Sequence, residues 1–562
     1  MTSSTELGRA LRILADFAEL RGDSEQAGDL RRAAAAIEGM PDPAVVELEH
    51  RVRRNRPDDE SAFNPAVQSR LREIVLGGGA RAITAAQTGL PTLIRSLLAL
   101  SAVASDEAVT LGRHGILTLP DLQAALDDER LGRTVGDAAG ARLRSAAGAL
   151  ELEAGQVSLG RASDSANAFI EAVARACPAV DLLVPAGEIR RWEPLISSIV
   201  VVGRASDPPG AIDALCRLSL VHDVLHHSGR RAIVLTGEGE IDVRVAAPDE
   251  YGTVLFTATG SRAHLSSVRQ RRGAPKLAAR EEDVYGHAGL PFIPAELRHA
   301  TGEIEAAAAG ALPGLVSREH IRGDLHMHTT YSDGADNVDA MVAACCALGY
   351  EYIAITDHSE RAAASRTLTR ADLARQRDEI AAIRDRYPQI VILHGVEADI
   401  MPDGRLDFSD AALEPLDIVL ASLHDSAGHD AKSLTRRAIQ ALRHPLVTIF
   451  THPENRIVGR RAGYPMDFDA IYAAAAETGT ALEVDGAPSH IDLDGEHARA
   501  AAAAGVTLVI DSDCHRARWL DRQMQIGIGT ARRGWIEPRH VLNARPLADV
   551  RAFIAAKRAR RP

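Results

Sequence analysis

Two histidines separated by one residue, His326 and His328, are the first place in the sequence where metal chemistry is expected. They lie in Gly323-Asp-Leu-His-Met-His-Thr-Thr-Tyr-Ser-Asp-Gly334. In an extended strand, residues two apart point to the same face, so both imidazoles can reach one ion. Taken alone, such a pair is more often two polar residues near a surface. Its meaning therefore depends on the residues in the remainder of the chain.

More side chains of the ligand type follow short apolar segments throughout the C-terminal part of the chain. Strands are predicted over 352–356, 390–393, 418–422, 447–451, 481–484 and 506–510, with helices between them. This alternation predicts a parallel βα barrel or sheet, in which ligands collect at the carboxyl ends of the strands. The further candidates at those ends are Asp333, His358, Glu397, His424, His452, Asp513 and His515.

These imidazoles and carboxylates are too many to be buried together without a cation. Neutral histidine and ionised carboxylate both bind first-row metals, and Cys514 is the only cysteine among the candidates, so a nitrogen and oxygen site for zinc or manganese is predicted. Nine ligands suffice for more than one ion. A centre of this kind activates water and neutralises phosphoryl oxygens, which predicts phosphoester hydrolysis.

Two arginines just beyond His452, Arg456 and Arg460, are candidates for holding the phosphate of a substrate. The alternative, a solvated basic loop, is equally compatible with the sequence.

The composition limits the class of protein. The 562 residues allow about three or four domains, and the net charge of −13 argues against a general nucleic-acid coat, so any DNA contact is expected to be local. The five cysteines fit neither a zinc ribbon nor a disulfide framework. Because neither a signal peptide nor a membrane-length apolar run is apparent, a cytoplasmic protein without a membrane partner is expected.

The first 160 residues are predicted to be helical. The segment 97–126 resembles the helix-hairpin-helix units that hold DNA phosphates through a Gly-x-Gly turn. Here Ala102 and Ala104 stand where the glycines would be, and a second copy around 135–140 is also imperfect. DNA binding by these hairpins and a purely structural role both stay open. Further on, strands are predicted over 199–202, 232–235 and 241–246, and a turn at 259–264 is predicted to open a helix.

The nine-residue series resembles that of the PHP (polymerase and histidinol phosphatase) domain, over about 318–562. The resemblance implies a distorted (β/α) barrel with three divalent ions, zinc or manganese. His326, His328, Glu397 and Asp513 would hold one ion with the reacting water bound to it. Glu397, His424 and His452 would hold the second ion, and Asp333, His358 and His515 the third.

The segment before it resembles bacterial family X DNA polymerases that carry a C-terminal PHP domain. Tyr285-Gly-His-Ala-Gly-Leu-Pro-Phe-Ile-Pro-Ala-Glu-Leu-Arg298 and Thr301-Gly-Glu-Ile304 are similar to the junction between their thumb and PHP domains, and 259–264 to their thumb motif. The resemblance implies a multidomain α/β protein: a helical lyase-type domain over 1–90, a helix-hairpin-helix-like region over 91–160, an α+β palm and thumb over 161–315, and the PHP barrel over 318–562.

The polymerase part departs from the family at its chemistry. Glu188 stands where the family has a serine that donates to the nucleotide, and Ser198 and Val200 stand where it has two metal-binding aspartates. Only the third carboxylate, Asp242, remains, and phosphoryl transfer with two metals needs more than one. Nucleotide addition is therefore expected to be lost. Schiff-base lyase chemistry is also excluded from the N-terminal domain, because no lysine precedes Lys276.

The activity that the resemblance implies is 3′→5′ removal of nucleotides from DNA, at primer or single-stranded 3′ ends. The alternatives are a phosphomonoesterase acting on a small ester, like the histidinol phosphatases, a non-catalytic DNA-binding scaffold, and residual polymerase activity in DNA repair. The sequence leaves the oligomeric state open, with a monomer as the expectation.

Overall fold

The chain, seen in a computed structural model, consists of two compact units. The structure describes residues 3–54, 63–127, 130–153, 156–273, 276–362 and 366–560. The N-terminal unit contains residues up to 157 together with 161–189 and 196–292, and the C-terminal unit contains 158–160, 190–195 and 293 onward. Among the described residues, no helix combines the length and apolar character needed to cross a bilayer. The division into four domains that the sequence suggests is finer than these two units and stays a prediction.

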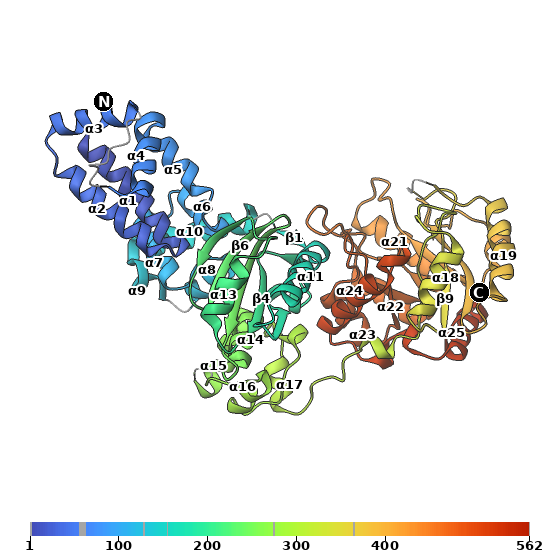
Figure 1. Cartoon of the computed structure of the whole chain (residues 1–562). Coiled ribbons are helices and arrows are strands. Elements are labelled where there is room, and N and C mark those ends of the chain that lie inside the picture. The colour runs from blue at the N-terminus through green and yellow to red at the C-terminus, as the bar shows by residue number, and fades with distance from the viewer. Residues whose placement is uncertain are drawn as a thin grey trace. The chain divides into compact units, whose positions relative to one another are not determined.

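Helices make up the first part of the N-terminal unit (Figure 1). They are α1 Ser4–Arg21, α2 Ser24–Glu38, α3 Asp42–Arg53, α4 Pro65–Gly77, α5 Gly79–Gln87, α6 Thr92–Ala99, α7 Ser105–Arg113, α8 Leu119–Asp127, α9 Arg130–Val135 and α10 Asp137–Glu153. Helix α1 begins with a capping box between Ser3 and Glu6, and its leucines at helical spacing enter a core shared with the helices that follow.

The two hairpin turns predicted from the sequence connect α6 to α7 and α9 to α10. In the first turn, the left-handed residue is Ser101 with a φ of 52°, whereas Ala104 is extended with a φ of −84°. In the second turn, Gly136 supplies a φ of 84°. The two alanines therefore do not carry the left-handed step of the first turn, which falls on a serine.

A five-stranded sheet follows, in the order β2-β4-β7-β6-β5. Its strands are β2 Leu182–Pro185, β4 Ile199–Arg204, β5 Asp223–His227, β6 Arg231–Thr236 and β7 Gly239–Ala246. Strands β4 and β7 pair in parallel and the other pairs are antiparallel. The three predicted strands are the central ones. The prediction did not include β2 and β5, which lie at the two edges and are less buried.

Short elements complete this part of the chain. They are β1 Val157–Ser158, α11 Leu159–Ala176, α12 Gly187–Arg190, β3 Leu195–Ile196, α13 Pro208–Cys216, α14 Tyr251–Thr259, α15 Arg262–Arg272 and α16 Glu281–His287. The predicted turn at 259–264 opens α15, because the Ser261 side chain accepts the His264 N–H and caps the helix.

Seven parallel strands in sequential order, β8 to β14, form the C-terminal unit, with helices around them (Figure 1). The strands are β8 Gly323–Asp324, β9 Tyr352–Ile355, β10 Val391–Asp399, β11 Ile418–Ser422, β12 Ile449–Phe450, β13 Ala481–Asp485 and β14 Leu508–Asp511. A parallel bridge between Met327 and Cys514, just beyond β8 and β14, joins the first strand to the last. The sheet is thereby a nearly closed barrel, as predicted.

The helical elements of this unit complete the βα alternation. They are η1 Ala295–Leu297, α17 Glu303–Ala308, η2 Arg318–His320, α18 Val338–Ala347, α19 Arg370–Arg384, α20 Asp410–Leu413, α21 Ala431–Leu442, α22 Phe468–Thr478, α23 Gly495–Ala503, η3 Ala517–Trp519, α24 Leu520–Arg533, η4 Pro538–His540, η5 Leu542–Ala544 and α25 Leu547–Ala559.

The strands are apolar on both faces because both faces are buried. Along β9, Ile353 and Ile355 join the large core shared with the helices, while Tyr352 and Ala354 join a second cluster with the neighbouring strands. This explains the continuous apolar runs of the sequence, which are typical of buried parallel strands. The predicted ends were accurate at β11 but not at β10, which continues to Asp399. Glu397 therefore lies within a strand.

Candidate metal centre

The structure brings the nine predicted ligand residues together at the carboxyl-terminal end of the barrel. His326 and His328 flank the Met327 bridge, so the closure of the barrel directs both toward one side. The other seven come from β10 or from the segments after β8, β9, β11, β12 and β14, and they are Asp333, His358, Glu397, His424, His452, Asp513 and His515.

Four of these side chains converge at one point. The Nε2 atoms of His326 and His328 are 3.1 Å apart, and they lie 3.5 and 3.6 Å from Glu397 Oε2. Asp513 Oδ1 lies 3.0 Å from His328 Nε2 and 3.5 Å from His326 Nε2. A tetrahedron with metal–ligand bonds of ~2.1 Å has edges of ~3.4 Å. The four atoms are therefore spaced as ligands of one ion would be.

Glu397 connects this group to a second one. Its other oxygen, Oε1, lies 2.9 Å from His452 Nε2 and 3.5 Å from His424 Nε2. The carboxylate is completely buried, and its two oxygens face two different sets of imidazoles. This is the arrangement that a carboxylate bridging two cations requires.

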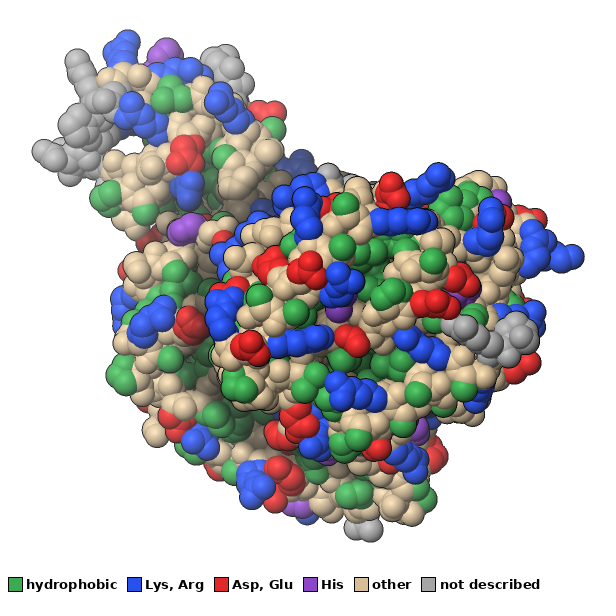
Figure 2. Space-filling model, turned by 90° about the vertical axis from the view of Figure 1, so that its right-hand side faces the viewer, with side chains coloured by type: hydrophobic (Ala, Val, Ile, Leu, Met, Phe, Trp, Pro, Cys, Tyr) green, Lys and Arg blue, Asp and Glu red, His purple; other side chains and the backbone are tan. Residues whose placement is uncertain are grey.

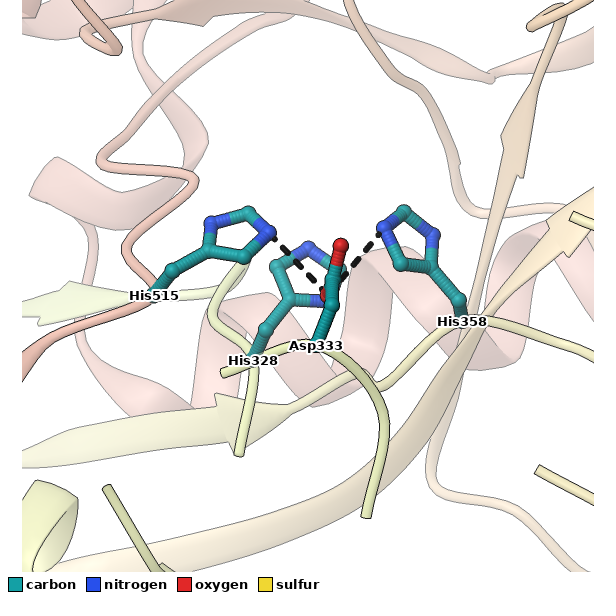
Figure 3. Close-up of side chains that lie close together, drawn as sticks. All are labelled: His328, Asp333, His358 and His515. Atoms are coloured by element: carbon teal, nitrogen blue, oxygen red, sulfur yellow. Dashed lines mark ion pairs between the residues drawn. The ribbon is translucent and has the colours of Figure 1, made fainter. Parts of the chain in front are cut away.

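A third group surrounds Asp333 (Figure 3). Its Oδ1 lies 3.2 Å from His515 Nε2 and 3.6 Å from His358 Nε2, and the His328 ring stacks between those two rings. His358 also turns its Nδ1 toward Glu397 Oε2 at 2.7 Å. His358 and His328 therefore link the Asp333 group to the first four ligands.

Buried ligand atoms without hydrogen bonds show that a cation fits this donor set. Glu397 Oε2 and His358 Nδ1 are both inaccessible, and although they lie 2.7 Å apart, neither has a hydrogen-bond partner among the described residues. An uncompensated buried carboxylate oxygen is unfavourable by several kcal/mol unless a cation or a donor meets it. Oxygen and imidazole nitrogen donors suit zinc and manganese, so the residues present fit a divalent metal.

The protonation of the imidazoles depends on the carboxylates around them. Burial lowers the pKa of His328 to about 4, and the nearby His515 and His358 act in the same direction. For His358, burial also opposes protonation, but the charges and contacts of Glu397 and Asp333 together outweigh it and raise the pKa to about 10. Imidazolium thus balances the buried carboxylates when no metal does, and a metal has to displace these protons.

Two further carboxylates orient predicted ligands by contacting the Nδ1 atom of a histidine. The sequence did not indicate either of them. Glu483 on β13 contacts His326 Nδ1 at 2.7 Å, and Asp399 on β10 contacts His424 Nδ1 at 3.1 Å. Asp399 follows Glu397 by two residues on the same strand, which places both on one face and could have suggested it. Glu483 has no comparable signal.

The two arginines predicted to hold phosphate lie in different surroundings. Arg456 donates from Nε to the His490 carbonyl at 3.0 Å, bonds the Ile491 carbonyl through Nη2 and approaches Asp494. This engagement makes Arg456 a link between two loops of the barrel rather than a guanidinium held ready for a substrate. Arg460 is exposed, and its role remains a prediction.

In the N-terminal unit, Asp242, the one polymerase carboxylate that the sequence predicts to remain, lies in ion pairs. The parallel register of β4 with β7 places Val200 opposite Asp242. Both oxygens of Asp242 accept from guanidinium groups, with Arg231 Nε at 2.8 Å and Arg244 Nη2 at 2.7 Å. The same two arginines also bind Asp121, at 2.6 and 3.2 Å. Asp242 is therefore not an open metal ligand.

Glu188, which is predicted to stand in place of the serine of the polymerase motif, is also engaged. It accepts the Ser197 N–H at 2.6 Å and the Ser197 hydroxyl at 2.8 Å. These bonds hold a carboxylate against the segment in which Ser198 stands for an aspartate. A negative group fixed there would repel the phosphates of a nucleotide.

The comparisons with known proteins identify the relationship. Over 570 aligned residues, 97% of this chain and 98% of the relative, the chain is 31% identical to the "DNA polymerase/3'-5' exonuclease PolX" of Bacillus subtilis. The chain belongs to the PolX family. The family model described as PHP domain matches residues 324–455, which include all the predicted ligands except Asp513 and His515. The chain is therefore a metal-dependent phosphoester hydrolase of the PHP type.

Other similarities of this PolX protein cover about a third of the chain. A probable phosphatase of Shewanella oneidensis is 33% identical over 204 residues, which cover 34% of this chain and 76% of that protein. The solved structure of a histidinol phosphate phosphatase from Lactococcus lactis covers 38% of this chain and 93% of its own, with 16% identity and a TM-score of 0.31.

Proposed function

We propose that this PolX protein is a 3′→5′ exonuclease that acts on DNA through its PHP domain and no longer adds nucleotides. The contrast between the two units supports the proposal most. The C-terminal unit has nine predicted ligand side chains that are linked by contacts in overlapping groups, whereas in the N-terminal unit the remaining carboxylate, Asp242, is paired with two arginines. The name of the Bacillus subtilis relative includes a 3′-5′ exonuclease.

The centre would hold three divalent ions, zinc or manganese. His326, His328, Glu397 and Asp513 would bind one ion, Glu397, His424 and His452 the second, and Asp333, His358 and His515 the third. Such ions, when bound, lower the pKa of a coordinated water and neutralise the charge on phosphoryl oxygens. The chain itself fixes the donors in a buried, low-dielectric end of the barrel, where such charges interact strongly with a substrate phosphate.

A phosphomonoesterase acting on a small ester is the second candidate. The net charge of −13 and the alanines of the first hairpin turn are less suited to a DNA enzyme, and the Shewanella relative is named a probable phosphatase. A non-catalytic DNA-binding scaffold is less well supported, since a structural metal site does not require nine ligand side chains.

One experiment separates these activities. The metal-loaded chain is incubated with end-labelled single-stranded DNA and with a small phosphomonoester, beside the variant His326→Ala/His328→Ala. A ladder of shortening DNA that is absent with the variant is the expected result. Hydrolysis of the small ester alone would replace the proposal by the phosphatase, and DNA retention without turnover would replace it by the scaffold. Primer extension with added nucleotides would show that the polymerase activity survives.

A further inference from the structure

An exposed tryptophan with two arginines lies immediately after the last predicted ligand. His515 is followed by Arg516, and the short helix η3 carries Arg518 and Trp519. The guanidinium carbons of Arg516 and Arg518 lie 5.2 and 5.1 Å from the centre of the Trp519 ring. Trp519 keeps 36% of its surface exposed, although aromatic side chains of this size are usually much more buried.

The backbone fixes this group relative to the metal centre. The Ala517 N–H donates to Asp336 at 2.8 Å, and the Ala335 N–H donates to the His515 carbonyl at 2.8 Å. The segment that carries the arginines is thus tied to the loop that follows Asp333. A substrate held there would lie beside the third group of ligands.

Apart from their contacts with Trp519, the guanidinium groups of Arg516 and Arg518 are not engaged by other described residues. Within the part of the chain that the structure describes, neither Arg516 nor Arg518 makes an ion pair or a side-chain hydrogen bond, and both are exposed. The other arginine–tryptophan stack of this unit differs, because Arg499, 4.1 Å from the Trp535 ring centre, donates to the Thr301 carbonyl. Stacked, exposed and unpaired guanidinium groups keep their N–H donors available for anions such as phosphate.

The described residues on the face drawn in Figure 2 form no broad basic patch. On that face, Lys and Arg side chains are interspersed with Asp and Glu. Binding of a polyanion to that face would therefore depend on small local groups of basic side chains. A small ester whose phosphate reaches the metal centre would need neither a second phosphate contact nor an exposed aromatic ring.

We infer that Arg516, Arg518 and Trp519 form the binding site for the single strand of DNA next to the bond that is cleaved. The arginines contact phosphates of the strand, and the exposed part of the indole stacks on a base, as aromatic residues do in proteins that bind single strands without sequence preference. The inference rests on the proposed exonuclease function and names the part of the site that selects a polynucleotide over a small ester.

The test compares two substrates and four variants of the full, metal-loaded chain. The variants are Arg516→Ala/Arg518→Ala, Trp519→Ala, the conservative Trp519→Phe, and Arg499→Ala as the matched control from the other stack. KM and kcat are measured on a single-stranded oligonucleotide and on bis(p-nitrophenyl) phosphate. We expect the double variant and Trp519→Ala to raise KM for the oligonucleotide by about tenfold or more. Trp519→Phe and Arg499→Ala should stay close to the wild type, and no variant should change the rate on the small diester.

Salt dependence and binding provide readouts that a structural defect would not reproduce. Each lost phosphate contact should reduce the slope of log affinity against log salt by ~0.7 for a single strand. Affinity is measured by fluorescence anisotropy with an oligonucleotide whose 3′ linkages are non-hydrolysable phosphorothioates. The inference would be overturned if the variants lost activity equally on both substrates. It would also be overturned if the double variant kept the affinity of the wild type and its slope of log affinity against log salt. If the wild type binds this DNA through the three residues but does not cleave the ordinary oligonucleotide, the proposed function fails and the inferred site stands.

Discussion

The Nδ1 atom of His326 lies 2.7 Å from Oε1 of Glu483, and both side chains are completely buried. The other oxygen of Glu483 accepts the backbone N–H of His452 at 2.7 Å. His452 has a φ of 27°, in the left-handed region that a residue with a side chain seldom adopts. One carboxylate therefore directs the Nε2 of His326 toward the centre and holds the strained backbone of a second predicted ligand.

Glu483→Gln is predicted to weaken metal binding without unfolding the barrel. An amide keeps one acceptor oxygen but replaces the other by a donor, so it cannot accept from both His326 Nδ1–H and the His452 N–H. We expect the affinity for the first ion to fall by about 10–100-fold, as is typical when a carboxylate behind a ligating histidine is changed. Competition with a chromophoric chelator measures this affinity directly.

The matched control for that experiment is Glu303→Gln. Glu303 is also completely buried in the C-terminal unit, and it accepts the Ala300 and Thr301 N–H groups at 2.8 and 2.7 Å, outside the metal centre. If both variants lose metal to the same extent, the effect comes from general destabilisation, and the orienting role of Glu483 is wrong.

Glu397→Gln is predicted to remove two ions, whereas Asp333→Asn removes one. Glu397 faces imidazoles with both oxygens, at 2.9 Å from His452 and 3.5 Å from His326, so two proposed ions depend on it. Asp333 contacts only the third group. Metal content per chain, measured by plasma mass spectrometry after dialysis, distinguishes the two variants. The same loss of metal in both variants would contradict a bridging role for Glu397.

Much of this centre was predictable because the predicted ligands lie near short apolar segments that alternate regularly with helical ones. His326-x-His328 and the residues that end apolar strands can be found from alternation alone. Glu483 and the Asp121–Arg231 pair could not be found in this way, because they depend on contacts between residues 157 and 110 positions apart. The extent of β10 was also missed, since the polar residues at its end face the centre instead of solvent. The two edge strands gave no clear signal because edges are only partly buried.

Removal of the metal is predicted to destabilise only the C-terminal unit. Without cations, the buried carboxylates must be balanced by protonated imidazoles, which burial disfavours. Bound metal at 100 times its dissociation constant stabilises the folded unit by about 2.7 kcal/mol. All three tryptophans, Trp192, Trp519 and Trp535, lie in this unit, so tryptophan fluorescence follows its unfolding separately. A chelator should lower the midpoint of that unfolding transition, and added zinc or manganese should restore it. An unchanged transition would indicate that the folded protein holds no metal in this centre.

The ion pairs of Arg231 and Arg244 with Asp121 and Asp242 predict a pH dependence of the N-terminal unit. Burial alone would raise the pKa of Asp121, but Arg231 and Arg244 outweigh it and lower the pKa to about 2. The unfolded chain binds the proton at the ordinary pKa of ~3.9, so between these values it binds more protons than the folded unit. The contribution of Asp121, on the order of 2 kcal/mol, is therefore complete above pH ~4 and is lost as the pH falls toward 2.

Asp121→Asn should remove this dependence. The variant is expected to be less stable at neutral pH by on the order of 2 kcal/mol, and the difference from the wild type should shrink as the pH falls from ~4 to ~2. Denaturant unfolding followed by far-UV circular dichroism, with the C-terminal unit followed through its tryptophans, measures the free energy of unfolding at each pH. Asp249→Asn, which changes an exposed carboxylate of the same unit, is the control and should leave the profile unchanged. If the difference between Asp121→Asn and the wild type is constant across this range, the Asp121 carboxylate is not stabilised by the two arginines in solution.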